Sequence, residues 1–137
     1  MIFSDNRKSA IKKLKNLFFS LKAEVKDYRE KMDLTFENPI LPNNVEYTER
    51  SYGGVACDVL SPEIYNTKRV ILYIHGGCFV GGSRKSYRPF VAALAAAVSS
   101  RAIVPDFRLA PTHAYPAALD DVQAVFRTLY TEELVAN

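Results

Sequence analysis

The sequence of 137 residues lacks long apolar runs, and we therefore expect no transmembrane segment. Its longest apolar run lies around residues 91–98, whereas a membrane-spanning helix needs about 18 to 20 apolar residues. The basic N-terminus has an apolar stretch at residues 17–19, but it lacks the longer apolar region and the cleavage site of a secretory signal. Leucine, isoleucine, valine and phenylalanine together supply 39 residues, which is enough for a packed core.

Cysteine is also scarce, which argues against a disulfide framework. The two cysteines, Cys57 and Cys78, have neither the CxxC spacing of a metal or redox site nor the density of a disulfide scaffold. We expect both to be reduced thiols and the chain to be cytoplasmic. The net charge of +3 is too small to indicate a nucleic-acid partner, although residues 1–31 alone carry +5.

Apolar residues at helical spacing dominate the N-terminal region. They recur at gaps of three and four residues with lysines on the opposite face, which predicts a helix packed on a core. Contact of this basic helix with an anionic membrane surface is a less favoured alternative. A group of helix breakers then predicts a boundary between a cap-like helical segment, residues 1–42, and a second unit, residues 43–137. The apolar residues are Ile11, Leu14, Phe18, Leu21, Val25, Tyr28 and Met32, and the breakers are Pro39, Pro42, Asn43 and Asn44.

After this boundary the pattern changes from helix to strand. Residues 45–52 and 55–62 predict two strands with polar residues on one side, joined by a hairpin turn at Gly53 and Gly54. Residues 70–74 are apolar at every position, which predicts an inner parallel strand buried on both faces. Its expected partner is a strand at residues 102–104.

Two helices are expected in the same unit. The alanine-rich residues 87–99 predict the crossover helix that joins the two parallel strands. A last helix is predicted from about Pro116, where a proline in the first turn costs no hydrogen bond, to about Glu133.

A loop with four glycines follows the apolar strand, at residues 75–83 (HGGCFVGGS), and is called the glycine loop below. Such glycines alone usually mark a turn. Two longer motifs, LYIHGGCFVGGS at residues 72–83 and DFRLAPTHAYPAALDD at residues 106–121, resemble the hormone-sensitive-lipase-like (HGGG-type) family of α/β-hydrolase fold esterases. The resemblance implies an α/β protein with a partial α/β-hydrolase fold. That fold comprises an N-terminal cap helix, then the first four strands with helices A and B of a mostly parallel sheet.

The resemblance also implies roles for the residues of the glycine loop. In this family the loop supplies backbone N–H donors to the oxyanion hole. Gly77 and Cys78 are then the donors, Gly76 permits the turn, and His75 supports the loop without acting as the catalytic base. Cys78 replaces the usual third glycine, which is compatible with the hole if its backbone conformation is open to residues with a Cβ. A nucleophilic role for Cys78 is a less favoured alternative, because no second histidine lies nearby in the sequence.

The remaining motif residues are expected to be structural. Asp106, Arg108 and Pro111 are expected to hold the loop that leaves the fourth strand. The pair Asp120 and Asp121 is explained by the dipole of the last helix. Ser83 is expected at a helix entry or in a loop, and His113 in a surface loop. The resemblance implies no metal or organic cofactor.

The catalytic serine of the family, in a GxSxG turn, and the Asp/Glu and His that follow it are absent from this sequence. The chain therefore resembles the N-terminal half of a carboxylesterase-type serine hydrolase, which we expect to be inactive alone. Its implied substrate is a small acyl ester. The apolar third strand would be an exposed edge, open to a complementing C-terminal half or to self-association.

Three hypotheses follow from the sequence. The favoured one is an esterase by descent whose activity requires a second half. The first alternative is a non-catalytic binding or assembly module that recruits a strand to the exposed sheet edge. The second alternative is a peripheral membrane protein held by the basic N-terminal helix.

Overall fold

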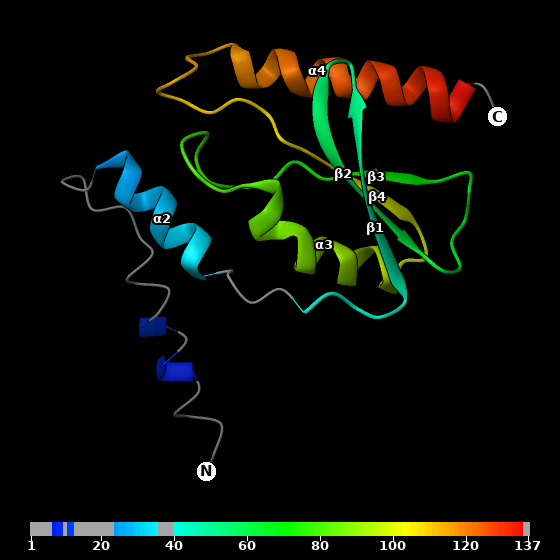
Figure 1. Ribbon diagram of the computed structural model, residues 1–137, viewed down its shortest axis with the longest axis horizontal. Coiled ribbons are helices and arrows are strands. Elements are labelled where there is room, and N and C mark those ends of the chain that lie inside the picture. The colour runs from blue at the N-terminus through cyan, green and yellow to red at the C-terminus, as the bar shows by residue number, and fades with distance from the viewer. Residues whose placement is uncertain (1–6, 10, 13–23, 36–39, 136–137) are drawn as a thin grey trace.

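The structure is a computed structural model that describes residues 7–9, 11–12, 24–35 and 40–135 (Figure 1). The middle of the predicted N-terminal stripe, residues 13–23, lies outside the described residues. Its C-terminal part forms helix α2, Val25–Thr35, in which Met32 is buried. None of the described helices is long and apolar enough to cross a membrane.

The first two strands form the predicted hairpin. Strand β1, Val45–Tyr52, pairs antiparallel with β2, Val55–Pro62, and Tyr52 faces Val55 across the turn. Gly53 and Gly54 have φ values of 58° and 83°, which suit the two positive-φ positions of a tight hairpin turn. A Cβ on Gly53 would lie 2.7 Å from the backbone of Ala124 in helix α4, Ala117–Leu129, so the hairpin tip packs directly on this helix.

The sheet is mixed and has the order β1-β2-β4-β3. Strand β4, Arg101–Pro105, pairs antiparallel with β2 and parallel with β3, Val70–Leu72. The predicted parallel pairing is confirmed, since Ile71 lies opposite Ala102. The prediction of a polar side for β2 is wrong, because β2 contributes to a hydrophobic cluster on each face of the sheet and six of its eight residues are buried.

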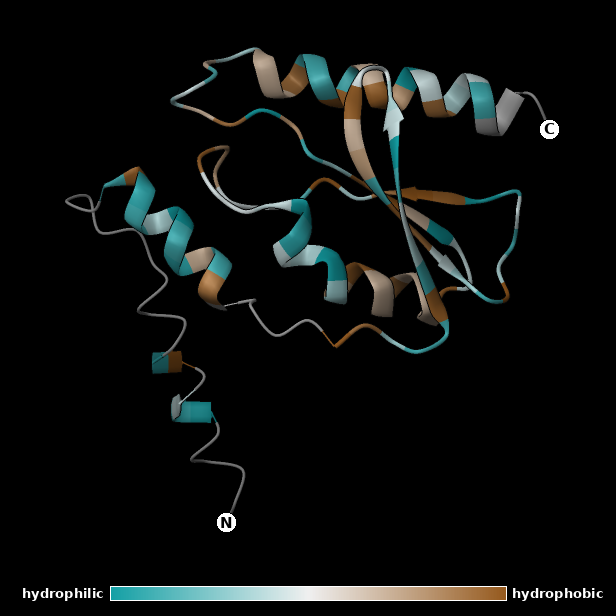
Figure 2. Cartoon of the chain, viewed as in Figure 1, coloured by the Kyte–Doolittle hydropathy of each residue, from teal (hydrophilic) through white to brown (hydrophobic). Residues whose placement is uncertain are grey.

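The prediction that residues 70–74 are buried on both faces is also wrong. Among the described residues β3 is the edge of the sheet, and its three residues are only half-buried. Ile74, just beyond β3, is 50% exposed. Figure 2 shows that this edge strand is nonetheless hydrophobic.

Helix α3, Arg84–Ala97, is the predicted crossover between β3 and β4, but it begins three residues earlier than expected. Its start is set by Ser83, whose hydroxyl oxygen accepts a hydrogen bond from the Ser86 N–H at 3.1 Å. Pro89 lies inside this helix. The predicted last helix is α4, and a π-helical segment η1, Tyr130–Val135, continues it past the expected end.

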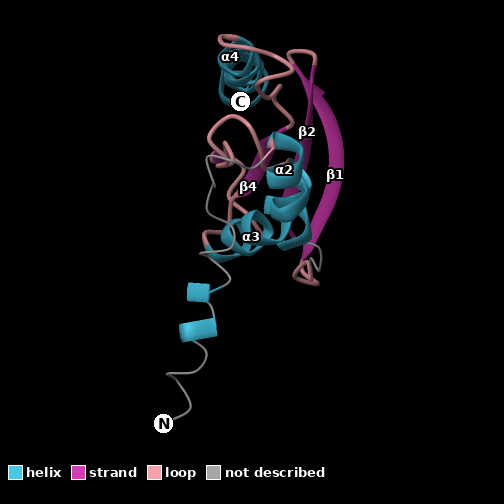
Figure 3. Cartoon of the chain, turned by 90° about the vertical axis from the view of Figure 1, so that its left-hand side faces the viewer, coloured by secondary structure: helices cyan, strands magenta, loops and turns pink. Residues whose placement is uncertain are grey.

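Helices α3 and α4 cover opposite faces of the sheet (Figure 1). Alternate residues of the strands divide between the two sides, as the period of a strand requires. Leu60, Ala102 and Val104 pack toward α3, whereas Val59 and Ile103 pack toward α4. Helix α2 lies beside α3, as Figure 3 shows from the side.

Candidate oxyanion-hole loop

The glycine loop connects the end of β3 to the start of α3 and folds around one carbonyl group. The Gly77 carbonyl oxygen accepts hydrogen bonds from the N–H groups of Val80 and Gly81, both at 3.0 Å. Gly77, Cys78 and Phe79 have φ values of 137°, 55° and 61°. Three consecutive positive φ values reverse the chain and turn the backbone of the loop back on itself.

Gly77 and Cys78 meet different steric limits. A Cβ on Gly77 would overlap the Gly81 carbonyl oxygen, so only glycine fits this position. The φ of Cys78 lies in the left-handed region that L-residues can occupy at a cost of about 1–2 kcal/mol. The departure from the family's third glycine is therefore sterically possible.

The N–H groups of Gly77 and Cys78 donate no hydrogen bond to any residue that the structure describes. The Cys78 side chain is exposed as well. Two adjacent backbone donors without an internal acceptor, on a tightly folded loop, are the groups that an oxyanion hole requires.

His75 is buried beneath the loop, with an exposed fraction of 6%. Its ring stacks on Phe107 at a centroid distance of 4.3 Å and on Tyr87 at 5.6 Å. The Nδ1 atom lies 3.0 Å from the Gly76 carbonyl oxygen, which places the proton of the neutral ring on Nδ1. Burial lowers the pKa of His75, so the neutral ring is favoured. These contacts fit a supporting side chain better than a proton acceptor for catalysis.

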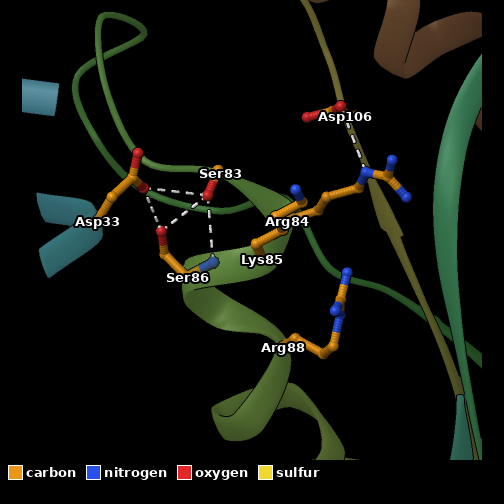
Figure 4. Close-up of a pocket in the computed structure, with 7 residues that line it drawn as sticks. All are labelled: Asp33, Ser83, Arg84, Lys85, Ser86, Arg88 and Asp106. Carbon is orange, nitrogen blue, oxygen red and sulfur yellow. Dashed lines mark hydrogen bonds and ion pairs between the residues drawn. The ribbon is translucent and has the colours of Figure 1, made fainter. Parts of the chain in front are cut away.

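The start of α3 lines a hollow of about 530 Å³ (Figure 4). Within it, the Arg84 guanidinium contacts the fully buried carboxylate of Asp58 at 2.7 Å and the carboxylate of Asp106 at 3.3 Å. Arg88, one turn further on, reaches Asp58 at 2.7 Å. The hollow is lined by Asp33, Ser83, Arg84, Lys85, Ser86, Arg88 and Asp106.

The ion pair with Arg84 gives Asp106 the structural role that was expected of it in the loop after β4. No group of three or more metal-ligating side chains occurs among the described residues.

Arg108 and Asp121 form an ion pair with several hydrogen bonds, which connects the loop after β4 to α4. The Arg108 N–H donates to Asp121 Oδ2 at 2.9 Å, and its Nη2 group donates to Asp121 Oδ1 at 2.8 Å. These bonds lower the pKa of Asp121. The structural role expected for Arg108 is confirmed, but the helix dipole alone does not explain Asp121. Pro111, Asp120 and His113 are exposed, as expected for His113 in a surface loop.

Comparison with known proteins identifies the same architecture. Residues 71–136 match the model of a family described by the α/β-hydrolase fold. LipR of Mycobacterium tuberculosis is 36% identical over 93 residues, which cover 68% of this chain and 30% of LipR. The solved structure of a hormone-sensitive lipase from a metagenome library is 32% identical, with a TM-score of 0.73, and the match covers 80% of this chain and 38% of that one. The chain thus contains part of an α/β-hydrolase fold and is similar in sequence and structure to hormone-sensitive-lipase-like esterases.

This hormone-sensitive-lipase-like chain spans less than a third of the length of the curated relatives it matches first. A further relative is the carboxylesterase/phospholipase LipF of Mycobacterium tuberculosis, 35% identical over 89 residues, which cover 65% of this chain and 22% of LipF.

Sequence reasoning missed two polar residues that join α2 to the glycine loop. Arg29 donates hydrogen bonds to the carbonyl oxygens of Val80 and Ala110, and Asp33 accepts a hydrogen bond from Ser86 Oγ at 2.6 Å. Both lie on α2, where the sequence pattern shows an apolar stripe and lysines. Their spacing of four residues places them on one face of a helix but does not indicate what that face contacts.

Proposed function

We propose that this chain supplies the oxyanion-hole half of a carboxylic ester hydrolase that acts on small acyl esters. The observation that carries the proposal is the pair of N–H groups at Gly77 and Cys78, which have no acceptor among the described residues. Gly76 allows the loop to leave the strand, and His75 supports it from below. The esterase names of the relatives support the same reaction class.

In the proposed reaction a serine from a second polypeptide segment attacks the ester carbonyl. The carbonyl oxygen becomes an anion, which the Gly77 and Cys78 N–H groups bind, and each such donor contributes about 10² to 10³ in rate. Collapse of the tetrahedral intermediate releases the alcohol, and water then removes the acyl group. The reaction requires no metal or organic cofactor.

The serine, the acid and the base of this mechanism must come from outside this sequence, which has no GxSxG motif. We therefore expect the chain alone to be inactive. Residues 1–42 would act as a cap-like segment and residues 43–137 as the N-terminal half of the hydrolase domain. The free thiols of Cys57 and Cys78 suit the cytoplasm as the compartment.

A second candidate function is a binding module that recruits a strand at β3. It is favoured by the position of β3 at the sheet edge and by the exposure of Ile74. A complementing half, a second copy of this chain or another protein could supply that strand.

The test is hydrolysis of p-nitrophenyl acetate and butyrate by the purified chain, with and without a polypeptide carrying the family's GxSxG, acid and histidine. A fluorophosphonate label reports the active serine. Activity and labelling only in the mixture would support the esterase proposal. No activity in the mixture, with a folded chain, would favour the binding module, and labelling of this chain alone would contradict our account of the nucleophile.

A further inference from the structure

We infer that Arg29 is a positioning residue that holds the glycine loop in the conformation in which Gly77 and Cys78 can bind an oxyanion. The inference rests on the proposed function and adds to it a residue outside the hydrolase motifs. It assigns to helix α2 a defined part in the site.

Arg29 bridges two loops by their main chains. Its Nε–H donates to the Val80 carbonyl oxygen at 2.7 Å, and an Nη2–H donates to the Ala110 carbonyl oxygen at 2.9 Å. Val80 lies in the glycine loop, and Ala110 lies in the loop after β4. The planar guanidinium can bond both carbonyl groups because its N–H donors point in fixed, different directions. A lysine ammonium is a compact charge on a flexible stem and lacks this geometry.

The two loops also contact each other directly at the same place. The Ala110 N–H donates to the Phe79 carbonyl oxygen at 2.9 Å, so Arg29 completes a cycle of hydrogen bonds through Phe79, Val80 and Ala110. Phe79 directly follows Cys78, and the Val80 N–H closes the turn on the Gly77 carbonyl oxygen. A shift of Val80 therefore moves the peptide groups that carry the two proposed donors.

Other residues of α2 keep Arg29 in register with the loop. A Cβ on Gly81 would lie 2.6 Å from the Tyr28 ring and 3.3 Å from the Met32 sulfur, so α2 packs directly on the loop backbone. One turn after Arg29, Asp33 accepts hydrogen bonds from the hydroxyls of Ser83 and Ser86. The glycine loop is thus attached to α2 at its middle and at its end.

Amide hydrogen exchange in the full chain tests the inference without requiring activity. The reporters are the N–H groups of Val80, Gly81 and Ala110, which are bonded within and between the two loops, and the reference is the Tyr73 N–H, which is bonded to the Ile103 carbonyl of the sheet. We expect Arg29→Met and Arg29→Lys to lower protection of the reporters about tenfold and to leave Tyr73 unchanged. Lys26→Met, on an exposed side chain of the same helix, is the matched control and should change neither.

Activity of the complemented enzyme supplies the second measurement. Because the loop is proposed to act on the transition state, both Arg29 variants should lower kcat with little change in KM. Unchanged protection of the three reporters would overturn the inference, as would lost protection with an unchanged kcat. If Arg29→Met also lowers protection of Tyr73, the variant has destabilised the sheet, and Arg29→Lys, which keeps the aliphatic stem and the charge, decides. Inactivity of the wild-type mixture would contradict the proposed function instead, while the exchange measurement would still test the contact.

Discussion

Cys78 has a backbone conformation that is strained for a residue with a Cβ but not for glycine. Its φ of 55° is in the left-handed region, and its side chain is exposed, so the sulfur gains little from packing. Gly77, at the preceding position, is limited by the overlap of any Cβ with the Gly81 carbonyl oxygen. At both positions glycine should therefore give a more stable protein than a residue with a Cβ.

We predict that Cys78→Gly raises the free energy of unfolding by about 1 kcal/mol, because it removes the left-handed strain. Gly77→Ala should lower it and should abolish activity in the complemented enzyme. Thermal denaturation of both variants, followed by circular dichroism, checks the two signs. Stabilisation by Gly77→Ala would contradict the conformation of the loop described above.

At the scale of elements, the buried carboxylate of Asp58 connects β2 to α3. Asp58 is fully buried and contacts both Arg84 and Arg88, which lie one turn apart on the helix. Arg84 also contacts the exposed Glu49, whose pKa it lowers by hydrogen bonding. The start of α3, and with it the end of the glycine loop, is thereby fixed to the sheet.

We predict that Asp58→Asn lowers the free energy of unfolding by about 3–5 kcal/mol, because two partly buried guanidinium groups lose the buried carboxylate that they share. Glu49→Gln is the matched control, because it removes an exposed partner of the same Arg84 and should have a much smaller effect. Urea denaturation of the two variants measures the difference. Equal effects would mean that burial of Asp58 adds nothing to the pair.

The elements could be predicted from the sequence wherever local signals decided them. Gly53 and Gly54 predict the hairpin that the structure shows. The helical spacing of apolar residues predicts the helix that the structure describes as α2. The exposure of β3 and the burial of β2 could not be predicted in this way, because they depend on the position of each strand in the sheet and on the helices that cover its faces. Helix α3 begins directly after Ser83, earlier than its alanine-rich segment predicts, because the Ser83 side chain caps it.

The candidate site could be predicted only in part for a related reason. His75, Gly76, Gly77 and Cys78 lie in one short segment and were found from the motif. Arg29 is 51 residues from Val80 in the sequence, and a contact over that distance leaves no local pattern. The assignment of the four motif residues to an oxyanion hole remains a prediction for the complementation assay.

At the scale of the whole molecule, the sheet has one hydrophobic edge. β3 is bonded to β4 on one side, and among the described residues no strand lies on its other side. Ile74, two residues after the end of β3, is 50% exposed. Such an edge favours pairing with another strand, including one from a second copy.

We predict that the chain alone self-associates through this edge and that Ile74→Lys shifts it toward the monomer, because a charge at the edge disfavours strand pairing. Ile64→Lys is the control, since Ile64 is 84% exposed in the loop between β2 and β3. Sedimentation velocity of the three proteins gives the oligomeric state. An equal effect of both lysines would attribute association to general hydrophobicity instead of the edge.

The contact between the hairpin tip and α4 bears on where a reporter can be attached. A fluorophore or an epitope inserted at Gly53 would push against the Ala124 backbone and separate the helix from the sheet. The exposed residues Thr67 and Lys68, between β2 and β3, offer an insertion point where added atoms would extend into solvent. A labelled chain for mixing experiments with a second half should carry its tag there.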